Sequence, residues 1–198
     1  MDLYRSKAKV TSVLEPAIAG LVHRGVRPDT LTLSAIPIGL VASACLLLSP
    51  TVPVILLGVP VLAGLRLVLN LLDGAVARRS GRTHPRGELY NEISDRLTDI
   101  AFLAPVAVLP GADRTIVFLG VLGAVLASVV GLASRAAGGE RIYRGILSKP
   151  GRMVLVGAFA IAAFVAGPEA WRWFGPVLLI GTVLTAAERI VVAIRRLE

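Results

Sequence analysis

Polar side chains recur at helical spacing in two neighbouring stretches of an otherwise apolar sequence. Arg66, Asn70 and Asp73 share one helix face, because residues three and four apart lie on the same side of a helix. A second face carries residues spaced by four: Gly87, Asn91, Asp95 and Asp99. Carboxylate and amide oxygens are ligands that Mg²⁺ and Mn²⁺ accept. The two stretches therefore predict a divalent-metal site, although interhelical hydrogen bonds and ion pairs that only hold the helices together are the alternative.

Small residues accompany these polar groups. Gly74, Ala77 and Gly87 remove side-chain bulk beside the oxygens, which leaves room for a ligand. His84 stands in a basic loop between the two stretches, and we expect it to be solvated.

The composition places these elements in a membrane. Of 198 residues, 55% are apolar and only 17% are charged, and the mean hydropathy is +0.76. A soluble domain of this length cannot bury so much apolar surface, and the same values exclude a disordered or collagen-like chain. The single cysteine, Cys45, excludes a disulfide framework and a CxxC zinc site. We assign the net charge of +8 to cytoplasmic loops and anionic lipid headgroups, and expect no nucleic-acid partner.

Six apolar stretches approach the length of about 20 residues that crosses about 30 Å of hydrocarbon. They cover residues 30–49, 52–72, 93–109, 116–136, 153–166 and 173–194. The third and fifth are short on apolar residues, and the third spans only if its polar start, residues 93–99, belongs to the helix. Residues 28–198 are thus predicted to form an all-α integral membrane domain of six transmembrane helices. Buried carboxylates in such a domain are costly and usually mark function.

Basic residues predict the orientation of the chain. Eighteen Lys and Arg residues fall on the side that carries both termini, and only Arg114 and Arg172 fall on the other. Cytoplasmic segments are enriched in Lys and Arg, so we expect both termini in the cytoplasm and the protein in the inner membrane.

Residues 1–27 precede the spans and have helical periodicity. Their apolar positions are Val10, Val13, Leu14, Ala17, Ile18, Leu21 and Val22. This spacing predicts an amphipathic helix on the cytoplasmic membrane surface, with a helix that packs against the bundle as the alternative. Asp29, directly after Pro28, is predicted to cap the first span.

The two polar stretches together contain an extended motif. Residues 70–95 read Asn-x2-Asp-Gly-x2-Ala-Arg-x8-Gly-x3-Asn-x3-Asp. This resembles the signature of the CDP-alcohol phosphotransferase family, in which aspartates occupy the first and third of the four acidic positions. The spacing matches throughout, and six spans after a surface helix also match the family. The resemblance therefore covers nearly the whole chain.

The resemblance implies a reaction and a role for each matching residue. Family members use a CDP-linked alcohol, often CDP-diacylglycerol, and a second alcohol attacks its pyrophosphate and releases CMP. Asp73 is then a metal ligand and Asp95 a ligand or the base, while Gly74 and Ala77 let the nucleotide approach and Arg78 contacts phosphate or nucleotide. The expected partners are the CDP-alcohol, an unidentified acceptor alcohol, the bilayer and a second copy of the chain.

Asn70 and Asn91 depart from the family signature. They lower the charge of the four motif positions from −4 to −2, so one divalent ion at Asp73 and Asp95 balances better than two. Catalysis with one or two ions is the favoured interpretation. The alternative is a catalytically silent relative that acts as a lipid- or nucleotide-binding membrane subunit.

Further site residues are predicted outside the signature. Asp29 and Thr32 lie where the family often has Pro-Asn-x2-Thr near the nucleotide. A basic cluster suits a phosphorylated acceptor or, alternatively, anionic headgroups: Arg135, Arg141, Arg144, Lys149 and Arg152.

Arg66 and Asp99 each lie one helical turn deeper in the membrane than the motif, about 6 Å by the helical rise. We expect them to form an ion pair below the site, because neither charge is stable alone at that depth. The alternatives are that Asp99 ligates a metal ion and that Arg66 faces a substrate phosphate.

Overall fold

The structure is a computed structural model that describes residues 3–197, with side chains described from residue 13 onward. The described chain is built from helices alone. The α-helices are α1 (Leu3–His23), α2 (Pro28–Leu48), α3 (Gly58–Ser80), α4 (Pro85–Leu103), α5 (Arg114–Ala136), α6 (Lys149–Ala166) and α7 (Phe174–Leu197). Short 3-10 helices precede or follow them: η1 (Pro53–Leu57), η2 (Ala104–Val108) and η3 (Pro168–Trp173).

Local sequence signals set the helix ends that matter for the site. Pro28 and Pro85 occupy the first turns of α2 and α4, where a missing N–H costs nothing. Helix α3 ends at Gly81, whose φ of +66° is the left-handed conformation that glycine adopts without strain. Only residues 81–84 separate α3 from α4, so the two polar stretches begin at the same end of the molecule.

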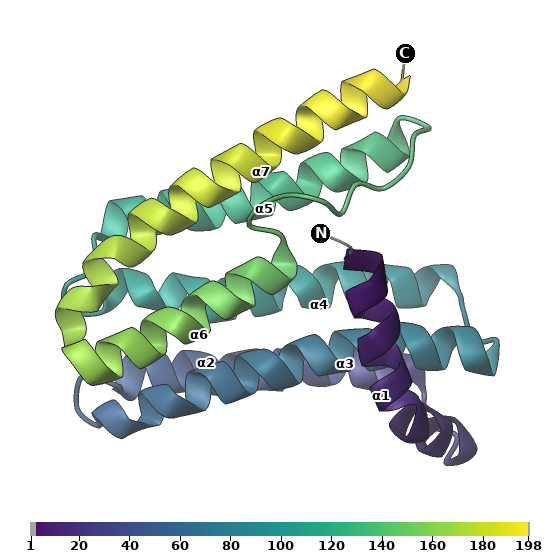
Figure 1. Cartoon of the computed structure of the whole chain (residues 1–198), viewed down its shortest axis with the longest axis horizontal. Helices are drawn as coiled ribbons and strands as arrows, with labels where there is room; N and C mark the ends of the chain where they lie inside the picture. Colours follow the sequence, from purple (N-terminus) through teal and green to yellow (C-terminus); the bar gives the residue numbers. More distant parts are fainter. Residues whose placement is uncertain (1–2, 198) are drawn as a thin grey trace.

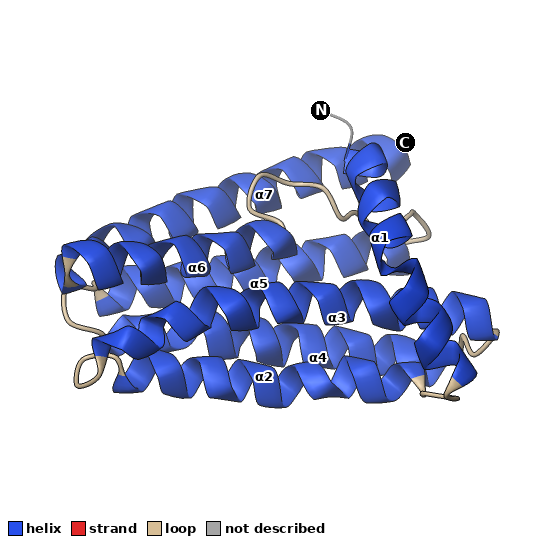
Figure 2. Cartoon of the chain, turned by 60° about the horizontal axis from the view of Figure 1, so that its bottom comes forward, coloured by secondary structure: helices blue, strands red, loops and turns tan. Residues whose placement is uncertain are grey.

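Helices α2 to α7 run along the long axis of the molecule, and α1 crosses them at one end (Figures 1 and 2). Helix α2 packs against both α3 and α4, α6 packs against α3, and α5 pairs with α7. The main core lies toward the end opposite α1 and is anchored by aromatic rings, with the Trp171 and Phe174 ring centroids 5.8 Å apart.

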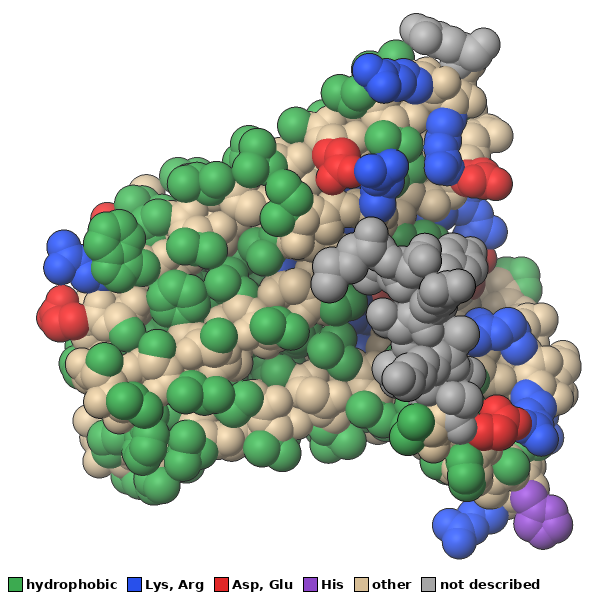
Figure 3. Space-filling model, in the orientation of Figure 1, with side chains coloured by type: hydrophobic (Ala, Val, Ile, Leu, Met, Phe, Trp, Pro, Cys, Tyr) green, Lys and Arg blue, Asp and Glu red, His purple; other side chains and the backbone are tan. Residues whose placement is uncertain are grey.

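The outer surface of the bundle is apolar. Hydrophobic side chains cover the flanks in the view of Figure 3, and charged side chains gather at the ends of the helices. Five segments are long and apolar enough to cross a membrane: Pro28–Leu48, Pro53–Ser80, Arg114–Ala136, Lys149–Ala166 and Pro168–Leu197. The chain is therefore an all-helical, multi-pass membrane protein. Helix α4 does not meet the same criterion, because its interior carries several charged residues.

Helix α1 packs on the bundle through part of its predicted apolar face. Ile18 is buried with Leu72 and Val76 of α3, and Leu14 and Leu21 pack around them. Val13 is 75% exposed and lies off this contact. Val10 lies outside the residues whose side chains are described. The contact with α3 fixes α1 beside the end of the molecule that carries the motif.

Candidate active site

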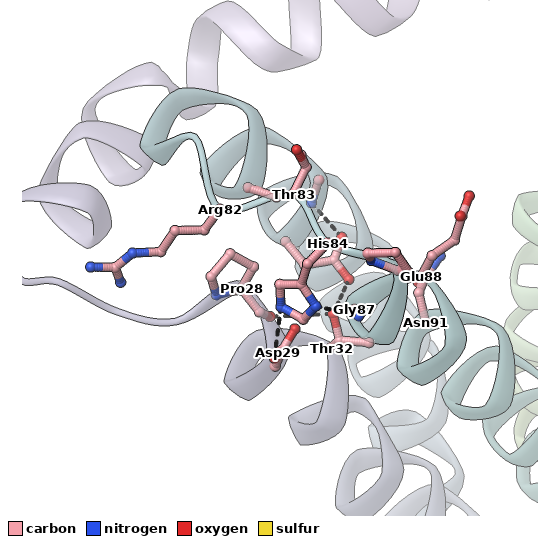
Figure 4. Close-up of a pocket in the computed structure, with 13 residues that line it drawn as sticks. Pro28, Asp29, Thr32, Arg82, Thr83, His84, Gly87, Glu88 and Asn91 are labelled. Atoms are coloured by element: carbon pink, nitrogen blue, oxygen red, sulfur yellow. Dashed lines mark hydrogen bonds and ion pairs between the residues drawn. The ribbon is translucent and has the colours of Figure 1, made fainter.

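A cavity of about 450 Å³ opens where α2 begins, α3 ends and α4 begins (Figure 4). Its walls combine residues of all three helices and of the turn between α3 and α4. They are Pro28, Asp29, Thr32, Asp73, Gly74, Ala77, Arg82, Thr83, His84, Pro85, Gly87, Glu88 and Asn91. Seven of the predicted site residues, including Asp29 and Thr32, therefore meet at one place.

Asp73 is the acidic group of the motif that faces this cavity. Its side chain is buried, with Thr32 Oγ1 donating to Asp73 Oδ2 at 2.8 Å and the Gly74 N–H donating to Oδ1 at 2.6 Å. Within residues 13–197 it makes no ion pair. Two neutral donors thus orient the carboxylate, and its charge stays available to a ligand in the cavity.

The glycines of the motif admit close neighbours. A Cβ built on Gly87 would lie 3.1 Å from Asp29 Oδ1 and 3.3 Å from the His84 ring, which is tighter than ordinary contact. A Cβ on Gly74 would lie 3.3 Å from Arg78 Nη1. The Arg78 guanidinium therefore covers the Gly74 turn, although Arg78 is not among the residues that line the cavity.

His84 was not expected at the site. Its Nδ1 accepts the Gly87 N–H at 2.9 Å as the N-cap of α4, and its Nε2 lies 3.3 Å from Asp29 Oδ2. The ring therefore links the start of α4 to the start of α2, as Figure 4 shows. The sequence signal was available, since a residue before Pro in the first turn of a helix is an N-cap position, but imidazole is an uncommon cap.

Of the remaining motif residues, Asn91 is part of the cavity wall, whereas Asn70 and Asp95 do not line the cavity. Asn70 Nδ2 and Asn91 Oδ1 are 3.4 Å apart, a long hydrogen bond between α3 and α4. Asp95 does not line the cavity; it is buried and forms ion pairs with Arg66 of α3 and Lys149 of α6 through the same oxygen, Oδ1.

The predicted Arg66–Asp99 ion pair is wrong. Arg66 pairs with Asp95, and Asp99 Oδ2 instead lies 2.6 Å from Arg152 Nη2. The reason is that α6 begins beside the two stretches and supplies two more cations at this depth. Because Arg152 pairs with Asp99, Arg66 pairs with Asp95 instead. All four residues are buried.

The basic cluster is neutralised within the protein. Arg141 pairs with Glu92, Arg135 with Glu88, and Arg144 with Glu188 at 2.7 Å. Sequence reasoning missed Arg189, which is buried and donates to the carbonyl oxygens of Ala127, Arg144 and Tyr143. These contacts hold residues 137–148, which connect α5 to α6, against the bundle.

The acidic and amide groups do not form a dense metal cage. In the described part of the chain, no three His, Cys, Asp or Glu residues lie close enough together to hold a metal ion. Asp73 and Asn91 line the cavity and provide oxygens from two helices. A cation there would need further ligands from a substrate or from water.

A cavity with polar walls at one end of a bundle with apolar flanks is the arrangement of a membrane protein with a ligand site at the ends of its helices. Comparison with protein-family models gives no match. The chain is 30% identical to the archaetidylinositol phosphate synthase of Pyrococcus horikoshii over 155 residues, covering 78% of this chain and 79% of that protein. It is 29% identical to the inner membrane protein YnbA of Escherichia coli over 184 residues, covering 93% of this chain and 90% of that protein.

Solved structures share the fold. The phosphatidylinositol phosphate synthase of Mycobacterium tuberculosis, in complex with manganese and citrate, superposes with a TM-score of 0.73 at 21% identity, covering 90% of this chain and 87% of that one. The same synthase with CDP-DAG bound gives a TM-score of 0.64 at 20% identity, covering 92% and 90%. The chain belongs to the CDP-alcohol phosphotransferase family. It is accordingly a transferase of phospholipid synthesis, as the motif indicated.

Proposed function

We propose that the protein transfers a phosphatidyl group from CDP-diacylglycerol to an acceptor alcohol and releases CMP. The observation that carries the proposal is the carboxylate of Asp73, which is buried, oriented by two neutral donors and free of ion pairs with residues 13–197 in a cavity at the end of an apolar bundle. A related synthase has been solved with CDP-DAG bound. A lipid-linked nucleotide has its polar part at such an end and its acyl chains along the apolar flank.

The reaction requires charge neutralisation more than covalent chemistry by the protein. The acceptor oxygen forms a bond to the phosphorus that carries the diacylglycerol, and the bond from that phosphorus to the CMP oxygen breaks. The proton of the acceptor hydroxyl leaves to a base or to water. Thr32 and the Gly74 N–H hold Asp73 in place, and Gly87 allows α2 and α4 to close around the nucleotide.

One divalent ion fits this site. Asp73 and Asn91 offer oxygens on the cavity wall, and Mg²⁺ and Mn²⁺ are bound by few protein groups together with substrate phosphates. The related synthase was solved with manganese. When bound, the ion lowers the negative charge that the pyrophosphate presents to the attacking oxygen. Asp95, in contrast, already shares Oδ1 between two cations.

We further infer that α4 and η2 complete six transmembrane segments, with α1 as a surface helix and residues 28–198 as the membrane domain. The buried face of α4 carries Ser94, Asp95 and Thr98, whereas Ile93, Leu97 and Ile100 point outward and are 41–49% exposed. An outward apolar stripe with an inward polar face is the arrangement expected of a helix that lies between lipid and a polar site. Both termini, the cavity and the basic connections share one end, which we assign to the cytoplasm.

The test is CMP release by the purified protein. We expect CMP from CDP-diacylglycerol in the presence of Mg²⁺ or Mn²⁺ and one acceptor from a panel of free and phosphorylated alcohols, and none after Asp73→Ala. Binding of CDP-diacylglycerol without turnover across the panel would favour a catalytically silent, lipid-binding subunit. This is the competing function because two motif positions are asparagines and Asp95 is already paired with cations.

A further inference from the structure

We propose that Arg66 and Lys149 take the place of a second divalent ion, so that the site holds one ion per chain. The inference rests on the proposed function and concerns how the charge of the pyrophosphate is balanced. Its starting point is that Arg66 Nη2 and Lys149 Nζ both contact Asp95 Oδ1. The two cations come from different helices, α3 and α6, and converge on one oxygen.

Both cations are fixed parts of the bundle. The Arg66 side chain is 3% exposed and that of Lys149 is 16% exposed, against 9% for Asp95. A buried cation is retained only where an opposite charge compensates it. Displacing both cations from Asp95 to make room for a metal ion would leave the buried Arg66 and the half-buried Lys149 without that partner, so we expect Asp95 to stay paired with them.

One divalent ion brings the net charge of the occupied site to about zero. Asp73 and Asp95 together carry the charge that Arg66 and Lys149 cancel, so these four groups sum to about zero. A pyrophosphate linkage adds about −2, which one divalent ion neutralises. A second ion would leave an excess of about +2 in a poorly hydrated region, where unpaired charge is costly.

The two asparagines agree with this balance. Asn70 and Asn91 lie within a long hydrogen bond of each other, and an amide pair needs no counter-ion. Aspartates at the same two positions would repel each other unless another cation lay between them. The asparagines and the two fixed cations are therefore parts of one arrangement, in which this chain's own side chains carry the charge of a second ion.

The experiment counts bound Mn²⁺ by electron paramagnetic resonance on the intact protein in lipid nanodiscs with saturating CDP-diacylglycerol. We expect one bound Mn²⁺ per chain in the wild type, with the spectrum of an isolated ion. In the Asn70→Asp/Asn91→Asp variant we expect two, at a spacing of about 4 Å that couples the two spins and broadens the lines. The matched control adds the same charge at the opposite end of the molecule, at the exposed positions Thr51→Asp and Thr115→Asp, and should bind one ion.

Two coupled ions in the wild type, or a single ion in the double aspartate variant, would overturn the proposal while leaving the proposed function intact. If CDP-diacylglycerol does not increase Mn²⁺ binding at all, both this proposal and the proposed function are contradicted.

A second measurement addresses Lys149 directly. Lys149→Met should weaken CDP-diacylglycerol binding by about tenfold or more, and Lys149→Arg should restore it; equal affinity in all three proteins would contradict a role for this cation in balancing the pyrophosphate.

Discussion

Asp73 and Asp95 are the two carboxylates of the motif, and they differ in what balances their charge. Asp73 accepts hydrogen bonds from a hydroxyl and a backbone amide, whereas Asp95 lies between two cations. A carboxylate oriented by neutral donors keeps its full charge for a ligand, and one held by two cations does not. We therefore assign ligand binding to Asp73 and a structural and electrostatic role to Asp95.

This difference predicts the effect of removing the Thr32 hydroxyl. Thr32→Val keeps the size of the side chain but deletes a hydrogen bond to a charged group, which contributes about 1.5–3 kcal/mol. We expect Mn²⁺ affinity in the presence of CDP-diacylglycerol to fall by about tenfold, measured by calorimetry. Ser34→Ala is the control, because among residues 13–197 Ser34 Oγ bonds only to Leu31 O, one turn away. Unchanged Mn²⁺ affinity in Thr32→Val would contradict the role of the Thr32 hydroxyl in orienting Asp73.

The buried Arg152–Asp99 pair predicts a coupled effect on stability. Breaking one partner of a buried pair leaves an uncompensated charge and costs about 3 kcal/mol or more. We expect Arg152→Leu and Asp99→Leu each to lower the unfolding temperature in detergent, and the double variant to recover part of the loss. Arg66→Leu with Asp99→Leu should be closer to additive, because these residues are not paired.

The exposed pair Arg196–Glu140, whose side chains are 46% and 85% exposed, serves as the control for that cycle. Its double-mutant coupling should stay below about 0.5 kcal/mol, because solvent screens surface ion pairs. Additive losses at positions 152 and 99 would show that the buried contact is not energetically significant.

At the scale of elements, the start of α4 meets the start of α2 at Gly87. A Cβ there would lie 3.1 Å from Asp29 Oδ1 and 3.3 Å from the His84 ring, so Gly87→Ala must displace the Asp29 carboxylate and the His84 ring by a few tenths of an ångström. We expect about tenfold weaker binding of CDP-diacylglycerol, because small displacements of binding groups are costly. Gly20→Ala in α1 is the control, since a Cβ there meets nothing within 4 Å. Equal binding by both variants would contradict closure at Gly87.

The elements themselves were largely predictable, and their mutual contacts were not. Spacing of three and four placed Asp73, Asn91 and the glycines on the right helix faces, because helical periodicity is local. The pairing of Arg66 depended on which other helix reaches the same depth. Lys149 and Arg152 lie more than 50 residues further along the chain than Asp95, and no local pattern shows that α6 begins beside α4.

The same argument applies to the basic cluster. Its residues were identifiable from charge alone, but Glu88, Glu92 and Glu188, which neutralise most of it, lie on α4 and α7. Charge density along a sequence shows where cations are, whereas their availability to a ligand depends on tertiary neighbours. His84 is exposed, as expected, with 42% of its side chain accessible. It also forms part of the cavity wall because α2 packs against α4, which charge alone does not show.

At the scale of the whole molecule, the distribution of charge predicts how the protein sits in the bilayer. The connections α1–α2, α3–α4 and α5–α6 lie at the end that carries the cavity, and α2–α3, α4–α5 and α6–α7 lie at the other (Figure 1). Arg86 lies at the first end and Glu169 at the second, and both are exposed. Because basic connections stay in the cytoplasm, we assign the cavity end to that side.

Cysteine labelling of intact cells tests this orientation. In a Cys45→Ser background, which removes the free cysteine in the described chain, we expect a membrane-impermeant maleimide to label Glu169→Cys from outside and Arg86→Cys only after the membrane is opened. Leu97→Cys, on the outward stripe of α4, should resist the reagent on both sides if α4 crosses the hydrocarbon. Labelling of residue 86 from outside would reverse the topology and place the cavity away from a cytosolic nucleotide, whereas labelling of residue 97 in sealed membranes would remove α4 from the spanning helices.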